Sequence, residues 1–578
     1  MRKESRNCIS QRLLCLLLVF AMLLGLCACV DPDVNVEATT TKPQPTTQTT
    51  APTTAPTTVP TTAPTTAPTT VPTTVPKPVK EPLVYVLTQE DVDLYYTLLQ
   101  DCETLALAGE DMEAIEAASD ALDAQYEYLY AQLSVANILY YCDSYSSAMK
   151  NQYLDCVDIC TEANKEYIEM ARRIYKSDSP AKDMLFEGWT DEDFAMLMAF
   201  DEKITKLQQR NEEITVEYNA ARKDDLKMDL YIEFVKNNNK IAKYYGYDNY
   251  YEYAYEMSYN RDYSPETLKQ MRQYAKDYLT ETFKNATLNF YNTFYSLGNA
   301  DQTSVTNFLY NDYTQGKNYV KLYLDAMPDN MADVIEYMID MDSTFTTSKK
   351  AKAGAFTTMI GERSYCYFGP GYASANTVLH EGGHYYASRF ADLGSIPLDL
   401  AETHSQGNEW LFTYFLKDHI PSKQYNALVN YRLYSDLAMI MICLMVDEFE
   451  QRVYTTDISK YTPEDFNELM ESVATQYFDM TYINDNLTDI QSYWRMVVVD
   501  QPIYYISYAV SSIASISLYE IALDDFEKAT NIYIKLCEEP VLEEGFLGNI
   551  KNAGLYSPFD EQFYKELQAL IESRTPNN

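Results

Sequence analysis

Positive charge is scarce in this sequence of 578 residues. Lysine and arginine number 45 against 85 aspartates and glutamates, which gives a formal net charge of −40. A chain this acidic cannot attract nucleic acid or anionic lipid through charge, because both carry the same sign. We therefore expect no nucleic-acid partner, and we ascribe the acidic balance to a solvated surface.

The apolar stretch near the N-terminus is also short. Basic residues up to Arg12 precede the run Leu13–Leu26, which is shorter than the about 20 residues that a membrane-spanning helix needs. The pattern predicts an export signal over residues 1–29. Its last four residues, Leu26 to Cys29, resemble a bacterial lipobox and predict a lipid on Cys29 that anchors the protein to the outer face of the cell membrane. A secreted protein with a plain signal is the alternative.

Large apolar side chains are missing from the next segment. From about Thr39 to Pro78 the chain is almost wholly threonine and proline, and the tetrad Pro-Thr-Thr-Ala/Val repeats from Pro52 to Pro76. With so little to bury, this segment cannot form a core. We expect residues 30–80 to be an extended spacer, because proline-rich chains span about 3.1 Å per residue.

Glycine and proline are sparse within long parts of the remaining chain, which favours helices. Apolar residues recur at spacings of three and four over Asp91–Leu107, Met112–Tyr141, Ser147–Tyr175 and Asp191–Arg222. Pro265 after Ser264 predicts the start of another helix, over Glu266–Leu297. Helices are expected again from Ala375 to Ser573. The sequence predicts a mainly α fold, with an N-terminal helical region over 81–345 and a second region over 346–578.

The region from Thr344 to Tyr372 departs from this helical pattern. Its short apolar runs are separated by glycine and proline, which is typical of short strands and turns. An exposed strand edge beside the following helix could bind an extended peptide as an added strand. The alternative is that these strands merely cap the helical core.

Histidine is rare, with four in the whole chain. Two of them stand in His380-Glu381-Gly-Gly-His384, which has the H-E-x-x-H pattern of zinc metallopeptidases. On a helix, residues four apart lie on one face, about 6 Å apart along the axis, so both imidazoles can reach one Zn²⁺. Glu381, about a quarter-turn round, can reach a water in the open position of the metal and act as a general base.

A catalytic zinc site needs a third protein ligand. The next acidic cluster, Leu398 to Trp410, is predicted as a second helix, and Glu402 is its best candidate ligand. Glu409, two turns on, is either an acceptor for the other N–H of a ligand imidazole or a solvated charge. His404 lies on a different side of that helix from Glu402, which predicts a local structural role or a contact with substrate rather than a metal ligand.

These segments together resemble the oligoendopeptidase F and thimet oligopeptidase family of zinc metallopeptidases. That family shows H-E-x-G-H followed by a helix of the form E-x-x-S-x-x-x-E, and the matching positions here are Gly383, Glu402, Ser405 and Glu409. Three further stretches are similar to family patterns: Lys352-Ala-Gly354-Ala355-Phe356, Lys240 to Tyr263, and Pro502-Ile-Tyr504-Tyr505-Ile-Ser-Tyr508. Together the matches span about residues 236 to 515.

The resemblance implies a large helical metallopeptidase fold with a small β-sheet beside the active-site helix and a deep substrate channel. It implies one Zn²⁺ per chain. The backbone of the strand that contains Gly354, Ala355 and Phe356 would then pair with an extended peptide.

The late tyrosine stretch would stabilise the oxyanion of the reaction. Tyr508 matches the family best, with Tyr505 or Tyr504 as the second donor, and Tyr504 is also a candidate for substrate contact. The family carries a histidine shortly before this stretch, whereas Arg495 to Pro502 contains none. That departure bears on the oxyanion donors and on the range of substrates.

These features predict a surface-anchored, zinc-dependent endopeptidase that acts outside the cell on short peptides, as a monomer. One alternative is an exo-acting carboxypeptidase or aminopeptidase on a similar scaffold. The other is a peptide-binding lipoprotein whose catalysis has decayed, for which the missing histidine is the only hint.

Overall fold

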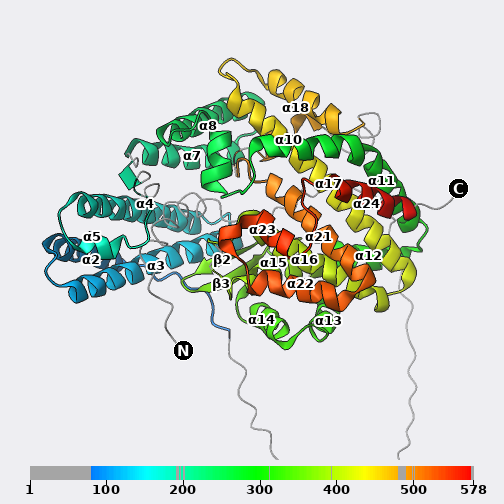
Figure 1. Cartoon of the computed structure of the whole chain (residues 1–578), viewed down its shortest axis with the longest axis horizontal. Helices are drawn as coiled ribbons and strands as arrows, with labels where there is room; N and C mark the ends of the chain where they lie inside the picture. The colour runs from blue at the N-terminus through cyan, green and yellow to red at the C-terminus, as the bar shows by residue number, and fades with distance from the viewer. Residues whose placement is uncertain are drawn as a thin grey trace, which may run out of the picture.

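The computed structural model describes residues 80–574, except 191–193, 195–196, 199–201, 311–312, 392–393, 480–489, 498 and 500. The predicted export signal with Cys29, and residues 30–79 of the predicted spacer, lie outside the described residues. The protein is mainly helical, as the sequence predicts, with one small sheet (Figure 1).

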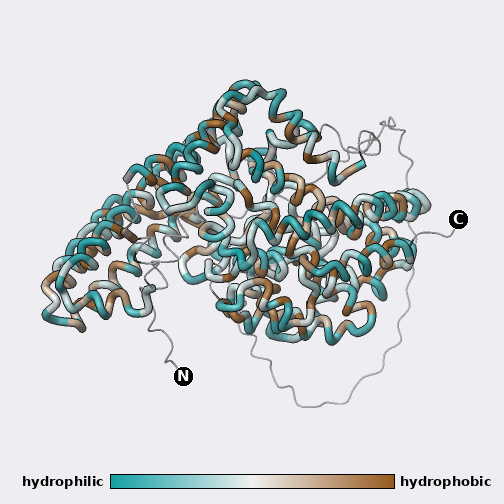
Figure 2. Tube along the Cα trace, turned by 45° about the horizontal axis from the view of Figure 1, so that its top comes forward, coloured by the Kyte–Doolittle hydropathy of each residue, from teal (hydrophilic) through white to brown (hydrophobic). Residues whose placement is uncertain are grey.

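The N-terminal helices form an elongated bundle with a core of its own, extending from the rest of the molecule in Figure 1. They are α2 (Gln89–Ala108), α3 (Met112–Cys142), α4 (Ser147–Lys176) and the short α5 (Ala181–Leu185). Asp111 and Ser146 cap α3 and α4 by accepting hydrogen bonds from backbone N–H groups of the first turn, which fixes both starts where the sequence predicts them. Apolar residues recur along these helices between hydrophilic ones, so each buries one face (Figure 2).

The larger body has one continuous core, whose members run from Ile214 to Ile571 and so lie on both sides of residue 345. Its helices are α7 (Glu202–Ala220), α8 (Asp224–Tyr244), α9 (Tyr250–Tyr253), α10 (Pro265–Tyr274), α11 (Thr280–Tyr295), α12 (Asn299–Tyr310), α13 (Tyr313–Leu324), α14 (Asp329–Asp340), α15 (Ala375–Ala387), α16 (Leu398–Phe415), α17 (Ser422–Thr455), α18 (Pro463–Tyr477), α20 (Trp494–Val497), α21 (Ile506–Asp524), α22 (Phe526–Glu538), α23 (Gly545–Asn552) and α24 (Glu561–Ser573). Short 3₁₀ turns occupy Leu416–Asp418, Ile490–Ser492 and Leu542–Glu544, and a π-helical turn occupies Ala254–Ser258.

The predicted helix over Glu266–Leu297 is interrupted. Its start is confirmed, since Ser264 caps α10 by accepting from the N–H of Thr267 at 3.2 Å, with Pro265 in the first turn. A π-helical turn, Ala275–Leu279, then separates α10 from α11. A single π-helical turn changes the local hydrogen bonding without breaking the run of helical residues, so apolar spacing alone gives no sign of it.

Two long apolar helices lie at the centre of the body. By length and hydropathy, α17 and α21 could each cross a membrane, but 83% of the most apolar window of each is buried inside the protein. Buried Asp447 and Glu450 also lie on α17. Both helices are therefore explained as core helices.

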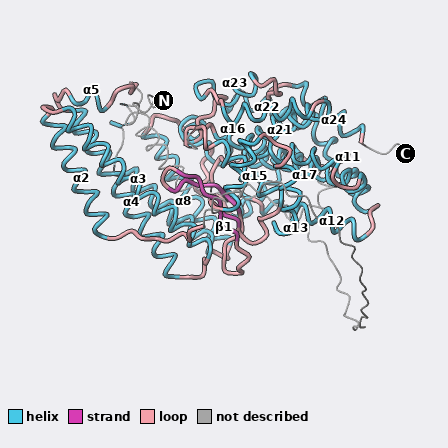
Figure 3. Tube along the Cα trace, turned by 90° about the horizontal axis from the view of Figure 1, so that it is seen from below, coloured by secondary structure: helices cyan, strands magenta, loops and turns pink. Residues whose placement is uncertain are grey.

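The sheet has the strand order β1-β3-β2, with β1 (Ser343–Phe345) parallel to β3 (Arg363–Phe368) and β2 (Ala355–Ile360) antiparallel to it. One face packs on α3, where Ile138 joins a cluster with Phe356 and Tyr367. Helix α15 packs against β2 and β3 as well. Figure 3 shows the strands where the N-terminal bundle meets the larger body. Strand β2 is at an edge of this sheet, directly beside the helix of the H-E-x-x-H pattern.

Candidate metal centre

Two neighbouring helices bring together three side chains that could hold a metal ion. His380 and His384 lie one turn apart on α15, and Glu402 projects from α16. The Oε2 atom of Glu402 lies 3.6 Å from the Nε2 atom of each imidazole. All three donor atoms lie within 4.8 Å of one another. The helical spacing predicts that the two histidines share one face, and Glu402 is the candidate that the next predicted helix supplied.

A glycine allows the two helices to approach this closely. A Cβ atom built on Gly383 would lie 2.4 Å from the backbone oxygen of His404 and 2.9 Å from the Cα atom of Ser405. Helix α15 therefore meets α16 backbone to backbone, one residue from His384. Only glycine fits there without moving one helix away from the other.

The donor set fits a zinc ion. Ligand atoms about 2.1 Å from a tetrahedral Zn²⁺ lie about 3.4 Å from one another, close to the observed 3.6 Å. The Nδ1 atom of His380 is 2.6 Å from Oε1 of Glu409, which leaves Nε2 to face Glu402. A carboxylate that holds the second ring nitrogen is the usual partner of a metal-binding histidine. Of the two roles left open for Glu409, its burial favours that of imidazole acceptor over that of solvated charge.

Electrostatics around the imidazoles also favour a cation. Burial lowers the pKa of His380, but its hydrogen bond to Glu409 and the nearby carboxylates outweigh burial and raise that pKa to about 9. Burial and the neighbouring His380 hold the pKa of His384 well below its usual range, so its ring is neutral. Burial raises the pKa of Glu402. Positive charge therefore stabilises the buried carboxylates of this centre, whether a proton or a metal ion supplies that charge.

Glu381 lies buried beside this centre. Its Oε2 atom accepts a hydrogen bond of 2.7 Å from the Thr357 hydroxyl of β2, which holds the carboxylate against the sheet. Among the described residues, its buried Oε1 atom has no hydrogen-bond partner. Burial raises the pKa of Glu381 to about 7, although Thr357 and His380 act in the opposite direction. A carboxyl group with a pKa near neutrality and one unengaged oxygen is suited to taking up and releasing a proton.

The late tyrosines gather on the other side of Glu402. The Tyr504 hydroxyl donates to Oε1 of Glu402 at 2.9 Å. The ring of Tyr504 lies 5.5 Å from that of Tyr508 and 6.0 Å from that of Tyr505, between ring centroids. The structure therefore places the three predicted tyrosines in one cluster, and it adds a direct contact between Tyr504 and Glu402 that the sequence did not predict.

The remaining predicted site residues are His404 and the segment Gly354 to Phe356. His404 is buried and directed towards α22, with its Nε2 atom 3.1 Å from the carbonyl oxygen of Leu536, which favours its structural role over a contact with substrate. Gly354 has φ +120 and directly precedes β2, while Ala355 and Phe356 are buried within the strand. The backbone pairing of this strand with a peptide remains a prediction.

Several contacts at the site come from residues that sequence analysis did not select. Besides Thr357, Arg432 of α17 forms an ion pair of 2.5 Å with Glu409 and lies 5.2 Å from the centre of the Trp410 ring. Asp436 accepts a hydrogen bond of 2.8 Å from the Trp410 indole. No local pattern marks these residues, because each acquires its role only when distant segments meet.

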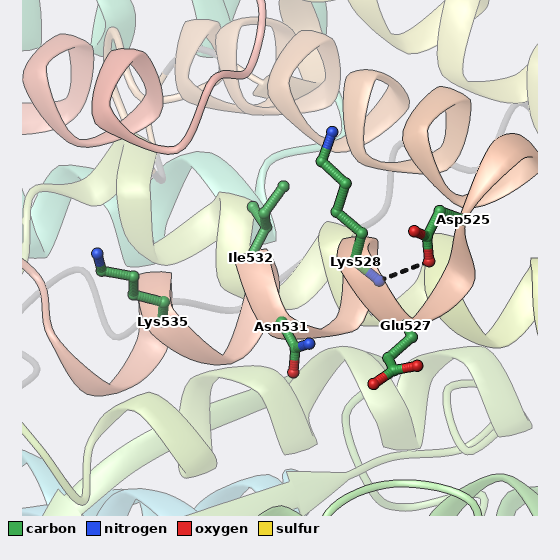
Figure 4. A pocket seen from close by; sticks show the side chains of 6 residues that line it. All are labelled: Asp525, Glu527, Lys528, Asn531, Ile532 and Lys535. Atoms are coloured by element: carbon green, nitrogen blue, oxygen red, sulfur yellow. Dashed lines mark hydrogen bonds between the residues drawn. The ribbon is translucent and has the colours of Figure 1, made fainter.

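A separate, open pocket of about 440 Å³ lies along α22 (Figure 4). It is lined by Asp525, Glu527, Lys528, Asn531, Ile532 and Lys535. Asp525 is engaged there as the cap of its helix, accepting from the backbone N–H of Lys528 at 3.0 Å. No residue of the candidate metal centre lines this pocket.

Comparison with known proteins supports the fold. No protein-family model matches the sequence, and no curated protein matches it. Among solved structures, PZ peptidase A in complex with an inhibitor is similar with a TM-score of 0.63 and 16% identity, over 86% of this chain and 99% of that one. A Bacillus anthracis protein named as a putative oligoendopeptidase F is similar with a TM-score of 0.64 and 17% identity, over 86% of this chain and 97% of that one. A further protein named as a putative oligoendopeptidase F has a TM-score of 0.66 and 14% identity, over 86% of this chain and 98% of that one.

These similarities cover almost the whole length of each solved structure. They agree with the resemblance that the H-E-x-x-H segment and the helix of Glu402 indicated from the sequence. The chain therefore has the mainly α fold of the oligoendopeptidase F structures.

Proposed function

We propose that this protein is a zinc-dependent endopeptidase that hydrolyses short peptides. The observation that carries the proposal is the arrangement of His380, His384 and Glu402 around one point, with the Glu381 carboxylate beside them. The names of the similar structures, a PZ peptidase and oligoendopeptidases, support peptides as the substrate class.

His380, His384 and Glu402 would hold the zinc ion. When bound, Zn²⁺ supplies a polarised water of lowered pKa. Glu381, held by Thr357, takes a proton from the attacking water and passes it to the nitrogen of the departing amine. Glu409 keeps the His380 ring turned so that its Nε2 atom faces Glu402.

The tyrosine cluster and β2 would act on the peptide itself. Hydroxyl groups of Tyr508 and Tyr505 donate to the carbonyl oxygen as it becomes negative, and one such donor is worth about 3 kcal/mol of barrier. The edge of β2 at Gly354, Ala355 and Phe356 pairs with the backbone of the extended substrate. A channel around the zinc ion then limits the substrates to short, unfolded peptides.

The location of the protein is part of the proposal. A lipid on Cys29 anchors it to the outer face of the bacterial cell membrane, and the threonine–proline segment holds the catalytic part away from that surface. The enzyme acts there as a monomer with one zinc ion. Mass spectrometry of the membrane fraction tests the anchor: we expect a diacylglycerol-modified Cys29, and an unmodified, secreted chain would contradict it.

Internally quenched peptides with both ends blocked test the reaction. An endopeptidase cuts them, whereas a carboxypeptidase or aminopeptidase leaves them whole and cuts only peptides with a free end. A zinc-loaded protein that binds these peptides without cutting any of them would favour the decayed lipoprotein.

The variant Glu381→Gln tests the mechanism. It keeps the size of the side chain but removes the proton acceptor, so we expect bound zinc to persist while kcat falls by several powers of ten. As a matched control, Glu527→Gln makes the same change at the separate pocket on α22 and should leave turnover unaltered. Near-normal turnover of Glu381→Gln would refute its role as the base.

A further inference from the structure

A residue with a left-handed backbone stands directly before the tyrosine that contacts Glu402. Ile503 has φ +63, a conformation that a β-branched side chain adopts only under strain. Its side chain is fully buried. Strain of this kind persists only where surrounding contacts over-determine the backbone, and it is concentrated at functional sites. The strain at Ile503 therefore indicates that the contacts around it have a function.

One contact holds the amide nitrogen of this peptide. The N–H of Ile503 donates to Oε1 of Glu450 at 2.9 Å, and Glu450 lies on α17, fully buried. Burial raises the pKa of Glu450 well above its ordinary value, although the N–H of Ile503 and nearby Arg261 act in the opposite direction. Glu450, a buried acid on a core helix, thus accepts the hydrogen bond of the N–H of Ile503.

Other contacts hold three successive carbonyl groups. The Tyr259 hydroxyl donates to the carbonyl oxygen of Pro502 at 2.7 Å. The Nη2 atom of Arg261 donates to the carbonyl oxygens of Ile503 at 2.8 Å and of Tyr504 at 3.4 Å. One short segment, which follows the π-helical turn Ala254–Ser258, therefore fixes the backbone on both sides of the strained residue.

Arg261 is itself held between two aromatic rings and next to a buried acid. Its guanidinium lies 4.6 Å from the centre of the Tyr255 ring and 4.5 Å from that of the Tyr259 ring, and its side chain has no exposed surface. Its Nε atom is 3.9 Å from Asp399, which lies in the first turn of α16, one turn before Glu402. The same arginine therefore connects the strained turn to the helix that carries the third ligand.

We propose that Arg261 and Glu450 clamp the peptide at Ile503 in order to position the Tyr504 hydroxyl on Glu402. Both are positioning residues that act through Tyr504, whose hydroxyl orients the carboxylate at 2.9 Å. The proposal rests on the proposed function only in taking Glu402 as a zinc ligand. A hydrogen bond that orients a ligand raises the affinity for the metal, so the clamp should set zinc affinity as well as turnover.

A double-mutant cycle on zinc affinity tests this without any peptide substrate. The full chain is prepared as wild type, Glu450→Leu, Tyr504→Phe and the double variant, and the dissociation constant for Zn²⁺ is measured by competition with a chelator. Glu450→Gln is the matched control, because its side-chain amide oxygen can still accept from Ile503. Circular dichroism and thermal unfolding of the metal-free proteins show which variants are folded.

We expect Tyr504→Phe and Glu450→Leu each to weaken zinc binding about tenfold, Glu450→Gln to stay near wild type, and the double variant to be no weaker than Tyr504→Phe alone. Losses that multiply in the double variant, or a Glu450→Leu protein with unchanged affinity, would overturn the clamp. Should Glu450→Leu be unfolded, Tyr259→Phe takes its place in the cycle with the same two criteria.

The clamp and the reaction can fail separately. A cycle that behaves as expected in a protein that cuts no peptide supports the clamp and overturns the proposed hydrolysis. If the wild type cuts peptides normally but the losses of zinc affinity multiply in the double variant, the proposed hydrolysis is supported and the clamp is overturned. Failure of the wild type to bind zinc overturns both.

Discussion

Replacing Gly383 by alanine tests whether the close contact of α15 with α16 builds the metal centre. The new Cβ atom would lie 2.4 Å from the backbone oxygen of His404 and 2.8 Å from its carbonyl carbon. An unstrained carbon–oxygen contact is about 3.4 Å, so the two helices must separate by roughly 1 Å. Because the obstacle is backbone, no side-chain rotation can relieve it.

The Gly383→Ala substitution has two opposing effects on the free energy of unfolding, and their expected magnitudes decide which is larger. Alanine gains about 1 kcal/mol over glycine as a helix former, while overpacking of this kind costs about 1–3 kcal/mol. We therefore expect a net loss of roughly 1 kcal/mol in the free energy of unfolding of the metal-free protein. Zinc affinity should suffer more, on the order of 100-fold, because metal sites tolerate displacements of only about 0.2 Å.

Gly382→Ala is the matched control in the same helix. There the Cβ atom would meet only the side chain of Ile335, at 3.2 Å, so a small shift of that side chain suffices. Chemical denaturation of the metal-free proteins and zinc competition are measured on both variants. Equal effects of the two substitutions, or wild-type zinc affinity in Gly383→Ala, would show that the close contact of α15 with α16 does not build the metal centre.

Three further predictions concern metal and charge. Chelation should lower the melting temperature and added zinc restore it, since zinc at 100 times its dissociation constant adds about 2.7 kcal/mol of stability; a melting temperature that ignores zinc would contradict the site. Glu409→Gln should weaken zinc binding about tenfold in chelator competition, because Glu409 orients the His380 ring. Unchanged zinc affinity would contradict that role of Glu409. Burial would raise the pKa of Glu448, but hydrogen bonds from Lys276, Tyr477 and Arg452 lower it from 4.5 to about 2, so its contribution is complete above pH 4.5 and is lost as the pH falls towards 2. Glu448→Gln should therefore cost about 3 kcal/mol of unfolding free energy at pH 7, with the difference from wild type shrinking below pH 4.5; a difference that does not depend on pH would rule out the charge as its origin.

Local patterns in the sequence were sufficient to predict the helical frame and to select the candidate metal ligands. The start of α3 at Met112 and of α4 at Ser147 follows from capping residues, which act within one turn. His380, Glu381 and His384 share one helix, so their geometry follows from the helical period. Glu402 needed one further assumption, that the next helix packs on the first.

The supporting contacts could not be predicted in the same way. Arg261 and Ile503 are separated by 242 residues, and Thr357 and Glu381 belong to a strand and a helix that meet only in the folded chain. Neither the π-helical turn at Ala275 nor the left-handed backbone of Ile503 leaves a mark in apolar spacing. Such features depend on tertiary packing, which can override local preference.

The division of the apolar interior into separate clusters has a consequence for denaturation. The bundle α2 to α5 holds its own cluster, and the body from Ile214 onward holds another, while a small third cluster joins Ile138 of α3 to the sheet. Two such units need not melt together. A calorimetric scan should then show a calorimetric enthalpy larger than the van't Hoff enthalpy, with the bundle losing its structure while the body that contains the candidate metal centre is still intact.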